Sequence, residues 1–155
     1  MRRHQAKKRT VAPDPRFSDA VITRFINVMM WDGKRAVSAK IFYGALEKAA
    51  LGEKKDAREL FHEVLGNIRP NLEVRSRRVG GATYPVPVPV RPERAEALAI
   101  RWVIQAARGR SEKTMTDRLA AEFRDAAGQR GGSFKKKTDI EKMADANRAF
   151  SHYRF

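Results

Sequence analysis

The sequence has no cysteine among its 155 residues, which excludes disulfide bonds and cysteine-based zinc sites. It also has no apolar run that approaches the ~18 residues of a membrane-spanning helix. The basic N-terminus is not followed by the apolar segment of a secretory signal, so we expect no such signal. These absences predict a soluble intracellular protein.

Motifs of catalysis and cofactor binding are missing as well. The segment Gly33-Lys34-Arg35 lacks the upstream glycine and the following Ser or Thr of a Walker-type phosphate loop. Neither an HExxH nor a GxSxG pattern occurs. Of the three histidines, only His62 lies in a helical pattern, where a surface or packing role is typical. We therefore expect no enzyme, no cofactor, no metal site and no small-molecule substrate.

Acidic residues are scarce relative to basic ones. Thirty-three Lys and Arg face eighteen Asp and Glu, and the formal net charge is +15. A binding partner that is an anionic polymer would relieve the resulting self-repulsion. Nucleic acid is the first candidate and an acidic membrane surface the second. Hydrophobic residues still make up 42% of the chain, which is enough for one domain with a core.

The segment 71–90, NLEVRSRRVGGATYPVPVPV, predicts a β-hairpin with Gly80 and Gly81 in its turn. Three prolines alternate with other residues in the second run, at 85, 87 and 89. Residues two apart point their N–H groups toward the same edge of a strand, so all three prolines fit the edge that faces away from the partner strand. The segment therefore predicts a stiff arm, with Arg75, Arg77 and Arg78 near its tip.

Arginine supplies every basic residue between positions 69 and 110. The nine are Arg69, Arg75, Arg77, Arg78, Arg91, Arg94, Arg101, Arg108 and Arg110. Because arginine binds phosphate with two donors and stacks on bases, this excess favours an RNA partner. A genome whose base composition favours arginine codons would explain the same excess.

Apolar periodicity predicts a mostly α single domain of six helices, with one protruding β-hairpin between the third and fourth helices. The expected helices span about 18–31, 35–51, 56–68, 92–108, 114–127 and 139–149. The expected end signals are Ser18 and Gly33 for the first helix, Gly52 for the second, Pro92 and Gly109 for the fourth, Thr114 with Asp117 and Gly128 for the fifth, and Thr138 with Glu141 for the sixth. In the second helix, we expect Val37, Ile41, Ala45 and Leu46 to face the core.

Basic residues also gather near both ends of the chain. Lys135, Lys136 and Lys137 directly precede the predicted sixth helix, where a bound anion would relieve their conflict with the helix dipole. The C-terminal run 148–155 mixes aromatic and basic residues, which suits either a base-stacking tail or a helix end packed on the core.

We expect a basic arm over residues 1–13, a helical domain over 14–150 that includes the hairpin arm 71–90, and a tail over 151–155. The arm carries Arg2, Arg3, Lys7, Lys8 and Arg9 with no acidic residue among them. It is either a solvated tail or a segment that orders on RNA or DNA.

Three stretches of sequence resemble bacterial small-subunit ribosomal protein seven. They are DAVITRFINVMMWDGKRAVSAKIFYGA (19–45), VRSRRVGGATYPVPV (74–88) and GGSFKKKTDIEKMADANRAFSHYRF (131–155). The similarity covers nearly the whole chain in one register, and the hairpin motif and the DGKR turn are highly specific to that family.

The resemblance implies a six-helix protein with a protruding hairpin that binds small-subunit ribosomal RNA. Family members bind a multi-helix junction in the 3′ major domain and nucleate assembly of the subunit head. Their hairpin approaches the exit-site (E-site) transfer RNA and the messenger RNA. They neighbour small-subunit proteins nine and eleven, and the implied location is the ribosome in the cytoplasm.

Carried over by position, the resemblance implies two sets of contact residues. The ribosomal RNA set is Arg2, Arg3, Lys7, Lys8, Arg9, Lys34, Arg35, Arg75, Arg94, Arg101, Lys135, Lys136 and Lys137. The set that faces transfer RNA and messenger RNA is Arg77, Arg78, Val79, Gly80, Gly81, Ala82 and Thr83.

Three other classes compete with an RNA-binding protein. A DNA-compacting protein would bind any B-form duplex and gain little from a proline-stiffened arm. A membrane-surface protein needs a helix that exposes a broad apolar face to lipid, whereas the apolar stripes here suit a common core. An enzyme lacks its catalytic constellation.

Overall fold

The computed structural model describes residues 9–153, which form six α-helices, one antiparallel β-hairpin and a 3₁₀ helix. The elements in chain order are α1 (Ala20–Met29), α2 (Arg35–Glu53), α3 (Ala57–Ile68), β1 (Leu72–Val79), β2 (Ala82–Pro89), α4 (Pro92–Arg108), α5 (Met115–Ala127), α6 (Gly131–Ala146) and η1 (Arg148–Tyr153). The predicted mostly α class, with a hairpin between the third and fourth helices, is confirmed.

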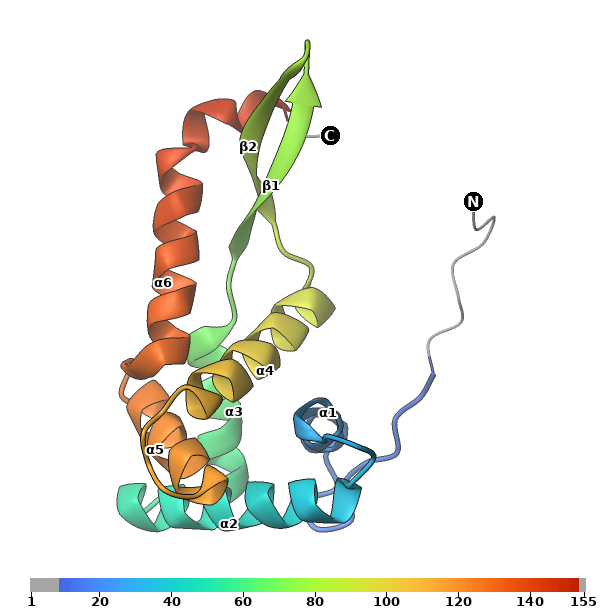
Figure 1. Cartoon of the computed structure of the whole chain (residues 1–155), viewed down its shortest axis with the longest axis vertical. Helices are drawn as coiled ribbons and strands as arrows, with labels where there is room; N and C mark the ends of the chain where they lie inside the picture. The colour runs from blue at the N-terminus through green and yellow to red at the C-terminus, as the bar shows by residue number, and fades with distance from the viewer. Residues whose placement is uncertain (1–8, 154–155) are drawn as a thin grey trace.

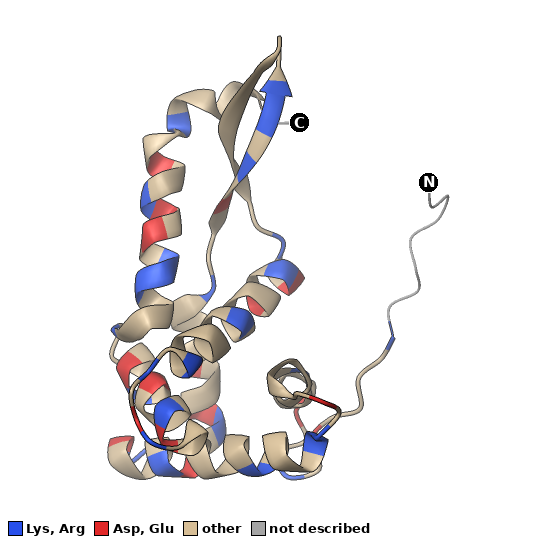
Figure 2. Cartoon of the chain, viewed as in Figure 1, with Lys and Arg blue, Asp and Glu red and all other residues tan. Residues whose placement is uncertain are grey.

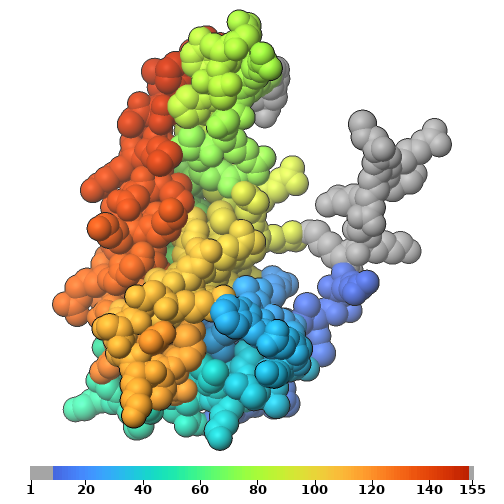
Figure 3. Space-filling view, in the orientation of Figure 1, coloured from blue at the N-terminus to red at the C-terminus, as the bar shows by residue number. Residues whose placement is uncertain are grey.

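The hairpin projects beyond the helices at one end of the molecule, and α2 crosses the opposite end (Figure 1). Helix α6 runs beside the hairpin and contacts β1, and η1 folds over onto β2. The space-filling view shows the same contact, with the red α6 surface against the green hairpin (Figure 3). The arm is therefore supported along one side.

Four phenylalanines form the centre of the helical core. Phe25 of α1, Phe42 of α2, Phe61 of α3 and Phe123 of α5 are each 0% exposed. Their ring centroids lie 5.1 to 6.3 Å apart in all six pairs, in tilted or edge-to-face arrangements that aromatic quadrupoles favour. The burial of each such side chain contributes about 1.5–3 kcal/mol.

The predicted inward face of α2 is wrong in part. Ala45 and Leu46 are buried as expected, but Val37 is 54% exposed. Phe42, which the apolar stripe left out, is fully buried in its place. The stripe through Val37 and Ile41 lies one position away from the side of the helix that faces α5.

Several helix ends follow their local signals. The Asp56 carboxylate accepts hydrogen bonds from the N–H groups of Arg58 (3.0 Å) and Glu59 (3.2 Å) at the start of α3. The Thr114 hydroxyl accepts one from the N–H of Asp117 (3.2 Å) at the start of α5. The predicted first turn at Pro92 and the C-cap at Gly109 are also confirmed.

The ends of α1 differ from the prediction by one or two residues. Asp19, not Ser18, is the N-cap, and its side chain accepts a hydrogen bond from the N–H of Val21 (2.7 Å). Ser18 adopts a left-handed conformation (φ 51°) in the preceding turn. Helix α1 ends at Met29, so Gly33 is not its C-cap but supplies a positive φ of 71° in the turn to α2.

Helix α2 continues to Glu53, past the predicted stop at Gly52. Lys54 takes the left-handed C-cap position, with φ 52°. Gly52 lies inside the last turn of the helix, against the side chain of Arg124.

The start of α6 differs from its predicted position more than that of any other helix. The helix begins at Gly131, eight residues before the predicted position, and the Thr138–Glu141 capping box does not form. Thr138 lies within the helix, and its hydroxyl donates to the carbonyl oxygen of Phe134 (3.1 Å). The N-terminus is capped by the buried carboxylate of Glu122 in α5, which accepts hydrogen bonds from the N–H (2.8 Å) and the hydroxyl (2.5 Å) of Ser133.

Two alanine variants compare a confirmed cap with the failed one. We expect Asp56→Ala to lower the free energy of unfolding by about 1 kcal/mol, because two N–H groups of α3 lose their acceptor. We expect Thr138→Ala to change it by less than about 0.5 kcal/mol. Urea denaturation measures both values, and an equal loss in the two variants would contradict the observed start of α6.

Candidate nucleic-acid interface

The backbone pairing of the hairpin places the prolines as the sequence predicts. The N–H of Val90 donates to the carbonyl oxygen of Asn71 (3.0 Å), so the backbone N–H of Val90 points toward β1. By alternation, the N–H groups of Val88, Val86 and Tyr84 also point toward β1, and the proline nitrogens between them lie at the outer edge of β2. The outer edge of β2 therefore has few donors for another strand, and the arm is protected against strand addition.

The two faces of the arm carry different arginines. Arg75 and Arg77 lie on the same face of β1, and Arg78 lies on the other. Arg77 donates a hydrogen bond to the carbonyl oxygen of Tyr153 in η1. Its cross-strand partner Tyr84 has its ring centroid 5.3 Å from that of Tyr153. The face with Arg77 is therefore covered by η1, whereas Arg78 is exposed.

The C-terminal aromatic residues pack on the hairpin. The ring of Phe150 lies 5.3 Å from the ring of Tyr84 and 6.5 Å from that of Tyr153. Of the two alternatives for the run 148–155, the described residues therefore support packing, against the arm rather than the helical core.

Basic residues occupy much of β1 and occur along α4 and α6 (Figure 2). Some have acidic partners within the chain: Glu73 accepts hydrogen bonds from the Nε atoms of Arg75 (2.6 Å) and Arg94 (2.7 Å). Others do not. Among residues 9–153, no partner in a hydrogen bond or ion pair exists for the exposed side chains of Arg78, Arg91 and Arg101. These last three side chains are free to bind an external anion.

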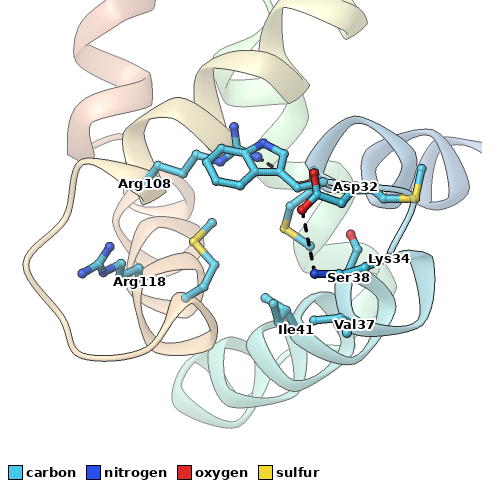
Figure 4. Close-up of a pocket in the computed structure, with 11 residues that line it drawn as sticks. Asp32, Lys34, Val37, Ser38, Ile41, Arg108 and Arg118 are labelled. Atoms are coloured by element: carbon cyan, nitrogen blue, oxygen red, sulfur yellow. Dashed lines mark hydrogen bonds and ion pairs between the residues drawn. The ribbon is translucent and has the colours of Figure 1, made fainter.

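The turn between α1 and α2 forms one wall of a pocket of about 500 Å³ (Figure 4). Lys34, which we predicted to contact RNA, lies on the rim of this pocket, with its Nζ atom 3.8 Å from a carboxylate oxygen of Asp32. Arg35 is exposed at the start of α2. Two further basic residues, Arg108 and Arg118, line the pocket from α4 and α5. The rim thus carries more positive than negative charge.

Trp31 is the feature of this pocket that sequence reasoning missed. Its side chain is 67% exposed, although tryptophan usually packs inside. The guanidinium of Arg108 lies over the indole ring, 4.6 Å from its centroid, and donates to the carbonyl oxygen of Met29 (3.1 Å). A flat aromatic surface backed by a fixed cation can stack a nucleobase. The sequence did carry one signal for this exposure, because Trp31 lies just outside the apolar stripe of α1.

The lysine cluster lies in the second turn of α6 and not before a helix. Lys135 and Lys136 are exposed, but Lys137 donates to the carbonyl oxygen of Asn67 (2.9 Å) at the end of α3. The expected anion at the helix N-terminus is supplied internally by Glu122. The predicted anion site at the N-terminus of this helix is therefore wrong. Among residues 9–153, the ammonium groups of Lys135 and Lys136 have no hydrogen-bond or ion-pair partner.

Asp14 anchors the segment that precedes α1 to α2. Of the basic arm, Arg2, Arg3, Lys7 and Lys8 lie outside the described residues, and Arg9 is exposed. Asp14 is buried, and its carboxylate accepts hydrogen bonds from the N–H groups of Arg16 (3.0 Å) and Phe17 (3.1 Å) and from the hydroxyl of Tyr43. Burial and the bond to Asp14 raise the pKa of Tyr43 to about 12.

His62 joins α3 to the start of α1. Its Nε2 atom lies 2.5 Å from a carboxylate oxygen of Asp19. Burial raises the pKa of Asp19, but the bonds from Val21 N–H and His62 outweigh burial and hold this pKa below its usual value. The contact is a structural link between α3 and the N-cap of α1, which fits the predicted surface or packing role.

Within residues 9–153, no group of three His, Asp or Glu side chains is placed to hold a metal ion. No helix in the same range is both long enough and apolar enough to cross a membrane.

Comparisons with known proteins identify the family of this chain. The family model described as ribosomal protein S7p/S5e matches residues 1–148. Small ribosomal subunit protein uS7 of Rhodospirillum centenum is 61% identical over 154 residues, which is 99% of this chain and 99% of that protein. The proteins of the same name from Novosphingobium aromaticivorans and Bartonella henselae are 60% and 58% identical over the same shares.

Proposed function

This chain belongs to the ribosomal protein S7p/S5e family, and we propose that it binds small-subunit ribosomal RNA directly and helps to assemble the subunit head. Proteins of this family are structural components of the ribosome and not enzymes. The proposed target is a multi-helix junction in the 3′ major domain of the RNA, and the proposed location is the ribosome in the cytoplasm.

The observation that carries this proposal is a projecting arm in a strongly basic chain, with exposed arginines that have no internal partner. Arg78 on the arm and Arg91 and Arg101 on the adjoining segment and α4 are in this state within the described residues. The net charge of +15 provides the attraction to phosphate. A neutral or basic partner would leave these cations unused.

We assign RNA contacts in two groups. The first is Arg2, Arg3, Lys7, Lys8 and Arg9 of the N-terminal arm, with Lys34 and Arg35 at the pocket, Arg75, Arg94 and Arg101 near the hairpin, and Lys135, Lys136 and Lys137 on α6. Trp31 and Arg108 join this group, because an unpaired base can stack where they meet. The second group is the hairpin tip, residues 77–83, which approaches E-site transfer RNA and messenger RNA.

The proposed mechanism is neutralisation of phosphate at a junction. RNA helices repel one another where they meet, and cations placed between them lower that repulsion. Each phosphate contact releases counterions, so the logarithm of the affinity falls by roughly 0.7 to 0.9 per contact for each tenfold rise in salt. The shape of the junction and its unpaired bases supply specificity. Small-subunit proteins nine and eleven are the proposed neighbours.

The test is a comparison of two nucleic acids over a range of salt concentrations. A 3′-major-domain RNA fragment and a B-form DNA of equal length are titrated with the protein. We expect the RNA preference to persist at physiological salt, because junction shape is absent from the duplex. Equal affinities that fall together would instead indicate a general polyanion binder, such as a DNA-compacting protein.

Charge reversal on α6 tests the exposed lysines separately from the fold. We expect Lys135→Glu with Lys136→Glu to weaken RNA binding and to reduce the salt slope by about 1.4 to 1.8 if each lysine contacts one phosphate. Lys137 is left unchanged because it holds the end of α3. Lys54→Glu, at the exposed end of α2, is the control for a general charge effect. Unchanged affinity in the double variant, with an unchanged melting temperature, removes this surface from the interface.

A further inference from the structure

A buried carboxylate lies at the root of the hairpin. Glu73 is the second residue of β1 and is 8% exposed. A carboxylate out of water is costly unless it is paired, and Glu73 has two cationic partners. One is Arg75 on the same strand, and the other is Arg94 in the first turn of α4.

The pair with Arg94 connects the arm to the body of the protein. Arg94 follows the end of β2 by five residues and belongs to a helix whose inner face is in the core. The Arg94 Nε atom lies 2.7 Å from the carboxylate of Glu73. Glu73 also lines a groove with Leu98 and Trp102 of α4 and with Ile140 and Met143 of α6. The carboxylate therefore lies where β1, α4 and α6 meet.

The length of the arm makes this root contact important. The eight residues of β1 extend roughly 25 Å, at about 3.3 Å per residue. A change of about 10° at the root moves the tip by roughly 4 Å. The outer support from η1 involves ring contacts with Tyr84, and η1 itself follows α6. Helix α6 also contacts β1 along its side, and the ion pair of Glu73 with Arg94 joins the root of the arm to α4.

We infer that Glu73 is a positioning residue that sets the direction of the hairpin through its ion pair with Arg94. It has no role in contacting RNA, and its partner arginines are held by it in the free protein. The inference goes beyond the proposed function, because it concerns the geometry of the protein without RNA. A buried ion pair that adds little net stability can still specify one arrangement, and here that arrangement is the angle between arm and body.

The absence of cysteine makes the direction of the arm measurable. Two introduced cysteines are the only thiols, and Thr83→Cys at the tip and Ala36→Cys on α2 are both at exposed positions. Spin labels on this pair report the tip-to-body distance and its spread in the RNA-free protein. In this labelled background we compare Glu73→Gln, Arg94→Gln, the double variant and the control Glu59→Gln, an exposed residue of α3.

We expect Glu73→Gln to shift or broaden the distance distribution, by roughly 4 Å for a change of about 10° at the root. Arg94→Gln should produce the same change, and the double variant should produce no more than either single variant. The melting temperature of Arg94→Gln should stay close to that of the parent, because this side chain is half exposed. The control Glu59→Gln should leave the distribution unchanged.

An unchanged distribution in the Arg94→Gln variant overturns the inference, even if Glu73→Gln proves too unstable to label. So does a double variant that broadens the distribution by the sum of the two single effects, since the residues would then act separately. Binding of the 3′-major-domain RNA is measured on the same samples. Failure of RNA binding in the parent protein would reject the proposed function and leave the distance result intact.

Discussion

Glu122→Ala is expected to lower the free energy of unfolding by about 3 kcal/mol, the largest stability effect of any single substitution proposed for this chain. Glu122 is 1% exposed and joins α5 to the start of α6 and to the loop after α4. One carboxylate oxygen accepts two hydrogen bonds from Ser133 at the start of α6, and the other lies 2.9 Å from Arg110. Alanine leaves the buried N–H and hydroxyl of Ser133 without an acceptor and opens a cavity.

A second substitution separates charge from hydrogen bonding at this position. Glu122→Gln keeps a carbonyl oxygen for Ser133 and the volume of the side chain, so we expect a loss smaller by roughly 1–2 kcal/mol than that of alanine. Arg110 retains Asp125 at 2.8 Å and Glu112 at 3.0 Å, which limits the cost of its lost partner. Urea denaturation of both variants gives the values. Losses below about 0.5 kcal/mol in both, as for a surface residue, would show that Glu122 does not cap α6.

The same residue explains why the start of α6 was not predictable. Asp56, Thr114 and Pro92 act on residues within one turn of themselves, so the local sequence was sufficient to place those helix ends. The first turn of α6 contains two glycines, which are poor helix formers, and its cap comes from a residue eleven positions earlier. A local pattern, Thr138 with Glu141, matched a capping box that tertiary packing overrides.

On the surface, too, features set by local sequence were predictable, and features set by contacts between distant segments were not. Proline alternation and a Gly-Gly turn are local, so the hairpin and its protected edge followed directly from the sequence. The count of arginines predicted an anionic partner but did not reveal which arginines are held internally. Glu73 and the carbonyl oxygen of Tyr153 hold three of them. The contacts of Arg94 with Glu73 and of Arg77 with Tyr153 depend on how distant segments meet. The stacking of Trp31 on Arg108 depends likewise on the packing of α4 against α1.

Shortening the hairpin tip should separate the two proposed RNA roles. Removal of residues 78–79 and 82–83 takes two residues from each strand and joins Arg77 and Tyr84 directly to the Gly80–Gly81 turn. Because the side-chain period of a strand is two, every remaining residue keeps its face. The contacts of Arg77 and Tyr84 with η1 are retained, and the arm becomes shorter by roughly 7 Å.

We expect the shortened protein to bind 3′-major-domain RNA within about twofold of the parent and to assemble into small subunits, because the N-terminal arm, the pocket and α6 are unchanged. Reconstituted subunits should release E-site transfer RNA faster, since the tip no longer reaches it. Arg78→Ala in the full-length arm is the matched control: it removes the exposed cation and keeps the reach. An equal effect of the two variants assigns the tip's role to charge, and a larger effect of shortening assigns it to reach. Loss of primary RNA binding on shortening would place the tip in the ribosomal RNA interface and contradict the proposed division of labour.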